Sequence, residues 1–396
     1  MQTIVLAYSG GLDTSVILPW LKDKYGCEVI AYAADLGQGK GELDGIEEKA
    51  LASGADEIVV EDLRKEFAEQ YCWPMLAANA VYEHVYLLGT SIARPLIAKG
   101  QVECAKKFGA DAVAHGATGK GNDQVRFELT FMALAPQLKI VAPWKMSDFE
   151  LTSREAAIEY AKAKGVPIQQ SREKIYSRDR NLWHISHEGA DLEDPANEPK
   201  DDLWVMSVPL SEAPDTPAVV QVDFEAGRPV GLDGVKLSGE TIIEKLNAVG
   251  GTHAVGQVDL VENRLVGIKS RGAYETPGGT ILYEAHRALE SLVLDRDTSH
   301  YKQQMGLKYA EMVYDGQWFH PLRHAMDAFI AETQRNVTGS VRVKCHKGHA
   351  RVAGVESANS LYNMDLASFT MGEEYTPSDA TGFIKLFGLQ MRGRGE

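Results

Sequence analysis

The chain up to residue 165 alternates short apolar runs with stretches whose apolar side chains recur at helical spacing. The apolar runs lie at residues 3–8, 28–35, 57–60, 111–115 and 139–143, and the helical stretches at 16–25, 43–52, 67–80, 92–108, from 124 onward and 154–164. Short continuous apolar runs are typical of parallel strands buried on both faces. The alternation predicts an α/β fold with a doubly wound parallel sheet, in which ligands bind beyond the carboxyl ends of the strands.

The pattern changes near residues 174–202, which are rich in charged residues, Pro and Gly and have few apolar runs. We place a domain boundary before this segment, so residues 1–168 form the parallel-sheet domain and residues 169–365 a second domain. The second domain has predicted strands at 218–224, 229–232, 257–261, 264–269, 341–345 and 350–355, and helices at 238–248, 277–294, 299–314 and 321–333. This mixture predicts an α+β domain.

Residues 366–396 form a third segment, a C-terminal helical tail. Within it, the stretch 376–389 carries the apolar residues Phe383, Ile384, Leu386, Phe387 and Leu389, which indicates an amphipathic docking helix. Such a helix packs either on its own chain or on another subunit, and the pattern leaves both open.

The totals are those of a soluble globular protein, with 44% hydrophobic and 24% charged residues. The net charge of −15 argues against nucleic acid as a partner, because binding to a phosphate backbone usually requires a basic face. Four scattered cysteines, Cys27, Cys72, Cys104 and Cys345, suggest neither a zinc site nor a disulfide framework. We see no leader and no membrane-spanning run, and therefore expect a cytoplasmic protein with no membrane partner.

The stretch around which the first domain is organised follows the first predicted strand. It consists of Ala7, Tyr8, Ser9, Gly10, Gly11, Leu12, Asp13, Thr14 and Ser15 and leads into the first predicted helix. A strand, a Gly-Gly turn and a helix N-terminus bring unpaired backbone N–H groups to one point, which favours a phosphate. Asp13 repels a bare phosphate and so indicates either a bridging Mg²⁺ or a helix cap. The string is neither a Walker A loop nor a Gly-x-Gly-x-x-Gly fingerprint.

Two later segments also concentrate polar groups. Residues 86–95 place a phenol, two hydroxyls and a guanidinium around a helix start, where Thr90 or Ser91 serves either as a helix cap or as part of a ligand site. Residues 115–123 form a Gly-rich loop directly after a predicted strand, and Arg126 lies one helical turn beyond Asn122. An Arg fork suits a carboxylate, so this loop indicates a binding site, with a solvated loop as the alternative.

The Ser-Gly-Gly-x-Asp-Thr string resembles the PP-loop of the ATP pyrophosphatases, which cleave ATP between the α- and β-phosphates. More specifically, the strings at 86–95, 115–127, 176–183, 192–195, 261–264 and 269–277 occur in the order and at the spacing of the argininosuccinate synthase family. The resemblance covers nearly the whole chain. It implies an adenine nucleotide α-hydrolase-like first domain followed by a synthetase domain.

The resemblance also implies a ligase of arginine biosynthesis that joins L-citrulline to L-aspartate through a citrullyl-adenylate and releases AMP and pyrophosphate. It assigns ATP to residues Ala7–Ser15, Ala34 and Gly116, and citrulline to Tyr86, Ser91, Asn122, Arg126, Ser177, Ser186, Glu262 and Tyr274. It assigns aspartate to Thr118, Asn122 and Asp123. Together with the PP-loop chemistry, it suggests Ser9, Asp13 and Asp123 as catalytic residues, Mg²⁺ with unknown ligands, and a homotetramer.

Three alternatives compete with this interpretation. Enzymes of the PP-loop group that thiolate tRNA need catalytic cysteines and a basic face, which this composition does not favour. Amidotransferase members need a glutaminase domain, whereas here Met1 leads straight into the PP-loop. A nucleotide-binding protein without turnover is the alternative of a different class, and it predicts ATP binding without citrulline-dependent formation of AMP.

Overall fold

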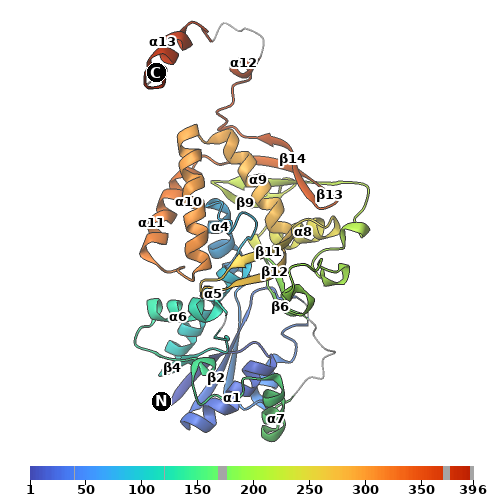
Figure 1. Ribbon diagram of the computed structural model, residues 1–396, viewed down its shortest axis with the longest axis vertical. Coiled ribbons are helices and arrows are strands. Elements are labelled where there is room, and N and C mark those ends of the chain that lie inside the picture. The colour runs from blue at the N-terminus through green and yellow to red at the C-terminus, as the bar shows by residue number, and fades with distance from the viewer. Residues whose placement is uncertain (40, 120, 168–175, 369–374, 393–396) are drawn as a thin grey trace.

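The computed structural model describes residues 1–39, 41–119, 121–167, 176–368 and 375–392 (Figure 1). The predicted boundary between residues 168 and 169 lies outside these ranges. The chain forms a parallel-sheet domain at one end, a larger mixed domain in the middle and a C-terminal tail at the other end. No helix among the described residues has the length and apolar character needed to cross a membrane.

The first domain is built on a five-stranded sheet in the order β3-β2-β1-β4-β5, with every neighbouring pair parallel. Its strands are β1 (Thr3–Ala7), β2 (Glu28–Asp35), β3 (Glu57–Asp62), β4 (Ala112–Ala114) and β5 (Lys139–Val141). The strand order reverses between β1 and β4, and a ligand site is expected beyond the carboxyl ends of the strands at such a point. The predicted doubly wound sheet is confirmed.

Helices cover both faces of this sheet. They are α1 (Leu12–Tyr25), α2 (Ile46–Ala52), α5 (Gly89–Phe108), α6 (Asp123–Leu134) and α7 (Arg154–Lys164). Alternate residues of β1 face opposite sides: Ile4 and Leu6 belong to the core that contains α1 and α7, whereas Val5 and Ala7 belong to the core that contains α5 and α6. This two-sided burial explains why the strand is continuously apolar.

One part of the N-terminal half leaves the parallel sheet and packs into the second domain. It comprises α3 (Arg64–Glu66), the π-helical η1 (Phe67–Cys72) and α4 (Trp73–Ala77). The ring of Tyr71 stacks on that of Trp318 at 4.6 Å between centroids, and both belong to a large core shared by the two domains. The predicted helix at 67–80 is thus divided into η1 and α4.

The second domain contains two antiparallel sheets with helices packed around them. The five-stranded sheet has the order β10-β9-β8-β13-β14, from β8 (Ala218–Glu225), β9 (Arg228–Leu232), β10 (Val235–Lys236), β13 (Gly339–His346) and β14 (His349–Glu356). The four-stranded sheet has the order β11-β12-β7-β6, from β6 (Ser177–Arg180), β7 (Ile185–Glu188), β11 (Gln257–Asn263) and β12 (Lys269–Glu275). The helices are α8 (Gly239–Thr252), α9 (Pro277–Val293), α10 (Arg296–Tyr314) and α11 (Pro321–Gln334), with short 3₁₀ turns at 190–193, 201–203 and 210–212. A further 3₁₀ turn, at 143–145, follows β5 in the first domain.

One predicted strand of the second domain is misplaced. Residues 264–269 were expected to be extended, but the strand β12 begins at Lys269, and the Arg264 amide donates to the Ile268 carbonyl at 2.9 Å to close a turn. Gly267 has φ of 87°, which only glycine adopts readily. The prediction was wrong because the apolar run Leu265, Val266 and Ile268 lies on the surface of this turn.

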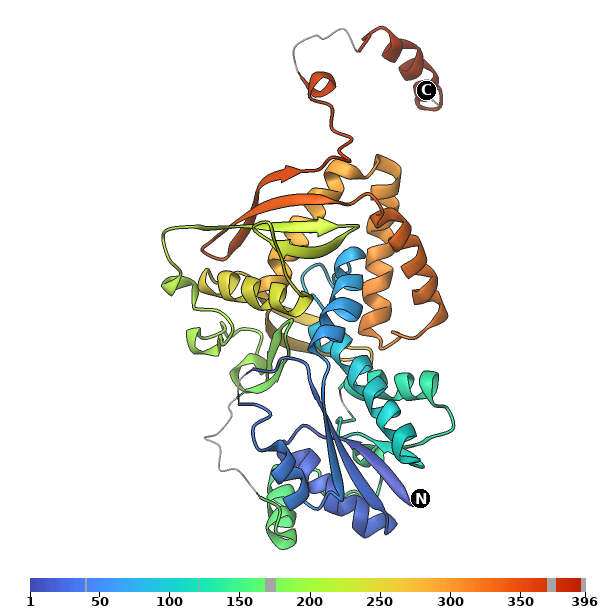
Figure 2. The ribbon, with the colours of Figure 1, turned by 180° about the vertical axis from the view of Figure 1, so that it is seen from behind.

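The C-terminal tail extends away from the two domains (Figures 1 and 2). It contains α12 (Met364–Ala367), α13 (Asp379–Phe387) and the 3₁₀ turn η6 (Gly388–Met391). The apolar side chains of α13 are exposed, with Phe387 at 73% and Leu386 at 72%. Within this chain, therefore, α13 does not dock its apolar face on the domains.

Candidate active site

The Gly-Gly turn joins β1 to α1 at the carboxyl edge of the parallel sheet. Gly10 has φ of 72°, and Gly11 is the N-cap residue of α1, with no side-chain cap. Asp13 lies in the first turn of α1, where burial raises the pKa of its carboxyl group and the nearby Arg154 opposes that shift. The capping role considered for Asp13 is therefore not supported, and its carboxylate faces the cleft described below.

Hydroxyl groups hold the loop around these glycines. Tyr8 Oη lies 3.0 Å from Ser15 Oγ, and Ser9 Oγ lies 3.2 Å from Thr14 Oγ1. Gly116, which follows β4, packs behind the loop, since a β-carbon there would lie 3.1 Å from Thr14 Cγ2. The carboxyl ends of β1 and β4 are thus packed tightly together.

A cleft of about 900 Å³ lies between the two domains. Its wall on the parallel-sheet side includes Ser9, Gly11, Leu12, Asp13, Tyr86, Gly116, Thr118, Asn122, Asp123 and Arg126, and its other wall includes Ser177, Ser186, Glu262 and Tyr274. Segments far apart in the sequence therefore meet at the predicted edge of the sheet.

The second wall of the cleft is one face of the four-stranded sheet. Ser177 pairs with Glu188 and Asp179 with Ser186 across β6 and β7, and Tyr274 of β12 lies opposite Ser186. Directly paired residues, and residues two apart on a strand, project to the same face. All five residues line the cleft. The wall thus consists of hydroxyls and carboxylates set in register.

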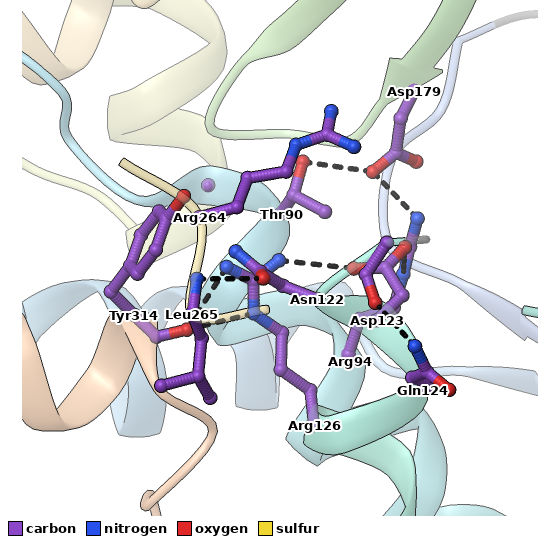
Figure 3. A network of polar contacts seen from close by, with 12 residues as sticks. Thr90, Arg94, Asn122, Asp123, Gln124, Arg126, Asp179, Arg264, Leu265 and Tyr314 are labelled. Carbon is purple, nitrogen blue, oxygen red and sulfur yellow. Dashed lines mark hydrogen bonds and ion pairs between the residues drawn. The ribbon is translucent and has the colours of Figure 1, made fainter. Parts of the chain in front are cut away.

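An alternating chain of charges crosses the floor of the cleft (Figure 3). Arg94 donates from Nε to Asp123 at 2.9 Å and from Nη2 to Asp179 at 2.8 Å. Arg126 donates from Nη1 to the other oxygen of Asp123 at 3.0 Å. Burial would raise the pKa of Asp123, but the Arg94 and Arg126 charges outweigh it and hold that pKa below its usual range. Asp123 is therefore a fixed carboxylate.

Arg126 and Glu262 both contact Tyr314, the last residue of α10. Arg126 donates from Nε and Nη2 to the main-chain carbonyl of Tyr314, at 3.1 and 3.0 Å. The sequence indicated a fork open to a carboxylate ligand, whereas in the structure this carbonyl occupies it. The carboxylate of Glu262 is buried and accepts hydrogen bonds from the phenols of Tyr274 and Tyr314. The ring of Tyr86 stacks on Tyr274 at 4.3 Å.

The segment 179–184, here called the strap, binds the second domain to the start of α5 through hydrogen bonds. Trp183 Nε1 donates to the Leu87 carbonyl at 3.0 Å, and Asn181 Nδ2 donates to the Gly89 carbonyl at 3.1 Å. Because α5 begins at Gly89, neither Thr90 nor Ser91 is its cap.

Thr90 and His184 complete this strap. Thr90 Oγ1 donates to Asp179 at 2.9 Å and lies 3.0 Å from His184 Nε2, which must therefore carry the proton that Thr90 accepts. Burial, together with the charge of Arg94, lowers the pKa of His184 to about 3, so its ring is neutral.

Comparison with known proteins assigns both domains to one family. The family model described as the arginosuccinate synthase N-terminal HUP domain matches residues 3–167, and the model of the arginosuccinate synthase C-terminal domain matches residues 176–393. The chain belongs to the argininosuccinate synthase family. The fold class and the family predicted from the sequence are confirmed, and the chain is thus a member of a family of ATP-using ligases.

Individual relatives match nearly the whole of this chain. The chain is 60% identical to the argininosuccinate synthase of Desulforamulus reducens over 394 residues, covering 100% of this chain and 98% of that protein. It is 59% identical to the enzyme of Moorella thermoacetica, covering 99% and 96%. It is also 58% identical to the chloroplastic argininosuccinate synthase of Arabidopsis thaliana, covering 100% of this chain and 79% of that protein.

Not every residue that the family resemblance assigns to the site reaches the cleft. Ala7, Tyr8, Gly10, Thr14, Ser15, Ala34 and Ser91 lie outside the set of described residues that line it. Ser91 is fully buried, and within the described ranges its Oγ has no hydrogen-bond partner. Its assignment to citrulline stays a prediction.

Several charged residues of the cleft were not among the predicted site residues. They are Arg94, Arg154, Arg178, Asp179, Glu188 and Arg264. Glu188 pairs with Arg264 at 2.7 Å, and burial raises the pKa of its carboxyl group against the opposing effect of that guanidinium. Two of them, Asp179 and Glu188, could have been found from the alternation Ser177-x-Asp179 and Ser186-x-Glu188. Residues two apart on a strand share a face, so each carboxylate lies on the same face as the serine two residues before it.

The described residues contain no group of three or more His, Cys, Asp or Glu side chains suited to a metal ion. A nucleotide-bound Mg²⁺ does not need such a cage, since it is usually held by phosphates, waters and one or two carboxylates. Asp13 beside the PP-loop is a carboxylate of this kind, so the residues present fit a Mg²⁺ that arrives with the nucleotide.

Proposed function

We propose that this chain joins L-citrulline to L-aspartate with cleavage of ATP to AMP and pyrophosphate, as a step of arginine biosynthesis. The ureido oxygen of citrulline attacks the α-phosphate and pyrophosphate leaves. The amine of aspartate then attacks the ureido carbon of the citrullyl-adenylate, and AMP leaves.

The observation that carries this proposal is the cleft itself. It joins a PP-loop with a free carboxylate to a wall of paired hydroxyls and carboxylates suited to amino-acid substrates. The ureido oxygen is a poor nucleophile, so positioning it in line with the α-phosphate must contribute much of the acceleration, about 7–11 kcal/mol in favourable cases. The hydrogen bonds between the domains support such positioning because they fix the two walls of the cleft relative to each other.

We assign the residues as follows. ATP is bound by Ala7–Ser15, Ala34 and Gly116, citrulline by Tyr86, Ser91, Asn122, Arg126, Ser177, Ser186, Glu262 and Tyr274, and aspartate by Thr118, Asn122 and Asp123. Glu262 remains able to accept further hydrogen bonds from an α-ammonium group, because each carboxylate oxygen accepts more than one.

Asp123 acts by orientation rather than by taking up a proton. Its two oxygens are engaged by Arg94 and Arg126, and its depressed pKa makes it a weak base. Asp13 would hold the Mg²⁺ that accompanies ATP, and that ion would neutralise charge on the leaving pyrophosphate. Ser9 would add a hydroxyl donor at the same phosphates.

Pyrophosphate release tests the proposal when citrulline and aspartate are omitted in turn. Omission of citrulline is expected to abolish release, and omission of aspartate to leave at most one turnover per site. Release that is independent of citrulline would contradict the proposal. ATP binding without any release would favour a nucleotide-binding protein.

We also propose that the protein is a homotetramer in the cytoplasm and that α13 crosses to another subunit. The support for the arm is that Phe383, Ile384, Leu386 and Phe387 are exposed on a helix that projects from the chain. Four buried free cysteines support a reducing compartment.

A further inference from the structure

Arg154 differs from the other arginines of the cleft. Five arginines line it within the described residues: Arg94, Arg126, Arg154, Arg178 and Arg264. Four of them donate hydrogen bonds to carboxylates, a histidine ring or main-chain carbonyls. Arg154 makes no hydrogen bond or ion pair with any described residue, and is the cleft arginine left with all its donors free.

The packing of α7 on α1 brings Arg154 to the PP-loop. Near the C-terminal ends of the two helices, Tyr160 Oη donates to Asp23 at 2.9 Å, and Lys164 Nζ lies 2.6 Å from the same carboxylate. Near their N-terminal ends, the charge of Arg154 acts on Asp13. The helices therefore run side by side in the same direction, and the first residues of both line the cleft.

The start of α7 is fixed in this place. Ser153 is its N-cap residue and accepts a hydrogen bond from the Ala156 amide at 3.1 Å. Arg154 is the first helical residue, and Thr152, Ser153 and Arg154 all line the cleft. The backbone of Arg154 is thus held beside the start of α1, while its long side chain has no partner among the described residues.

We propose that Arg154 binds the β- and γ-phosphates of ATP from the start of α7, beside the PP-loop, and stabilises the leaving pyrophosphate. This inference rests on the proposed function. Negative charge builds up on the β-phosphate oxygens as the bond to the α-phosphorus breaks, and a guanidinium fork matches phosphate oxygens in geometry and charge. The other four arginines are less suited to this task because carboxylates, a histidine ring or main-chain carbonyls already occupy part of their donors.

Steady-state kinetics of Arg154→Ala test the proposal. We expect the citrulline-dependent rate of pyrophosphate release to fall roughly 10²–10³-fold, the usual effect of removing one donor from a developing anion. The KM values for citrulline and aspartate are expected to change little, and Arg154→Lys to retain part of the activity. Added guanidinium ions should restore part of the rate of Arg154→Ala. Lys162→Ala, which removes a cation from the exposed end of the same helix, is the control and should behave as wild type.

Three outcomes would overturn the inference. One is a rate for Arg154→Ala within twofold of the Lys162→Ala control. Another is a loss of rate that guanidinium does not restore and that comes with a raised KM for citrulline, which would indicate a structural role. Failure of the wild-type chain to release pyrophosphate with citrulline would refute the proposed function, and this inference with it.

Discussion

Asp179→Ala tests whether the charge chain across the cleft holds the two domains in their working arrangement. Asp179 belongs to β6 of the second domain, whereas its partners Thr90 and Arg94 belong to α5 of the first. Removing the carboxylate leaves Arg94 with Asp123 as its remaining acidic partner and leaves the Thr90 hydroxyl without its acceptor. We expect weaker docking of the domains and a less well-defined site.

The size of the effect follows from the contacts. Asp179 Oδ2 accepts at 2.8 Å from Arg94 and at 2.9 Å from Thr90. The Arg94 and Asp179 side chains are 17% and 30% exposed, so solvent screens them only in part. A hydrogen bond to a charged group contributes roughly 1.5–3 kcal/mol. Because Arg94 keeps one carboxylate partner, we expect a loss of about 2 kcal/mol in the free energy of unfolding, near the lower end of that range.

Two measurements check this expectation. Urea unfolding followed by tryptophan fluorescence gives the change in stability, and initial rates give the KM values for both amino acids. An interaction loss of about 2 kcal/mol expressed in binding corresponds to a KM raised by more than tenfold. The control is Glu311→Ala, which removes an ion pair with Lys308 whose side chains are about half exposed, at 54% and 50%. Such a surface pair contributes about 0–1 kcal/mol.

An unfolding midpoint and KM values for Asp179→Ala that match those of Glu311→Ala would refute the reasoning. The chain of hydrogen bonds would then contribute no more than a surface pair. A stability loss with unchanged KM values would show that the chain serves the fold and not the substrates.

Three further predictions concern separate features. Asp13→Ala should fold as wild type, because Asp13 does not cap α1, but should lose most activity; loss of the fold with unchanged Mg²⁺ dependence would contradict this assignment. Gly89→Ala should lower the free energy of unfolding by roughly 1–3 kcal/mol, because its β-carbon would lie 2.2 Å from Cδ2 of the buried His184. An unchanged urea midpoint would show that the segment 179–184 can move to accommodate the added methyl group. A chain ending before Thr376 should no longer form tetramers in light scattering, and an unchanged tetramer would rule out the arm.

The parallel-sheet domain was predictable because its central strands, β1, β2 and β4, are buried on both faces. Such strands are continuously apolar, and the Gly-rich loops between them mark the carboxyl edge of the sheet. The placement of Ser9, Asp13 and Gly116 at one edge follows from topology alone. The family resemblance then supplied Ser186 along with Ser177, Glu262 and Tyr274 from the matching strings, and these four residues line the opposite wall.

The strands β6 and β7 were missed because little in their sequence is apolar. Their cleft face carries Ser177, Asp179, Ser186 and Glu188, and their position depends on pairing with β12, far away in the chain. The opposite error occurred at Leu265–Ile268, where an apolar run lies on an exposed turn. Both cases show that the environment of a short segment is set by its tertiary partners rather than by its own composition.

The charge chain was not predictable either. Arg94, Asp123 and Asp179 are widely separated in sequence, and each alone is compatible with a solvated surface. The packing of α6 on α5 brings Asp123 to Arg94, and the docking of β6 on α5 adds Asp179. The end of α10 reaches the same floor, where the Tyr314 carbonyl accepts hydrogen bonds from the Arg126 fork.

Transfer of an oxygen label tests the central claim most directly. Citrulline labelled with heavy oxygen at the ureido group is incubated with ATP, aspartate and the wild-type chain, and the products are weighed by mass spectrometry. If the ureido oxygen attacks the α-phosphate in this cleft, each AMP released carries one labelled oxygen. Label that remains entirely in the amino-acid product would contradict the adenylate mechanism.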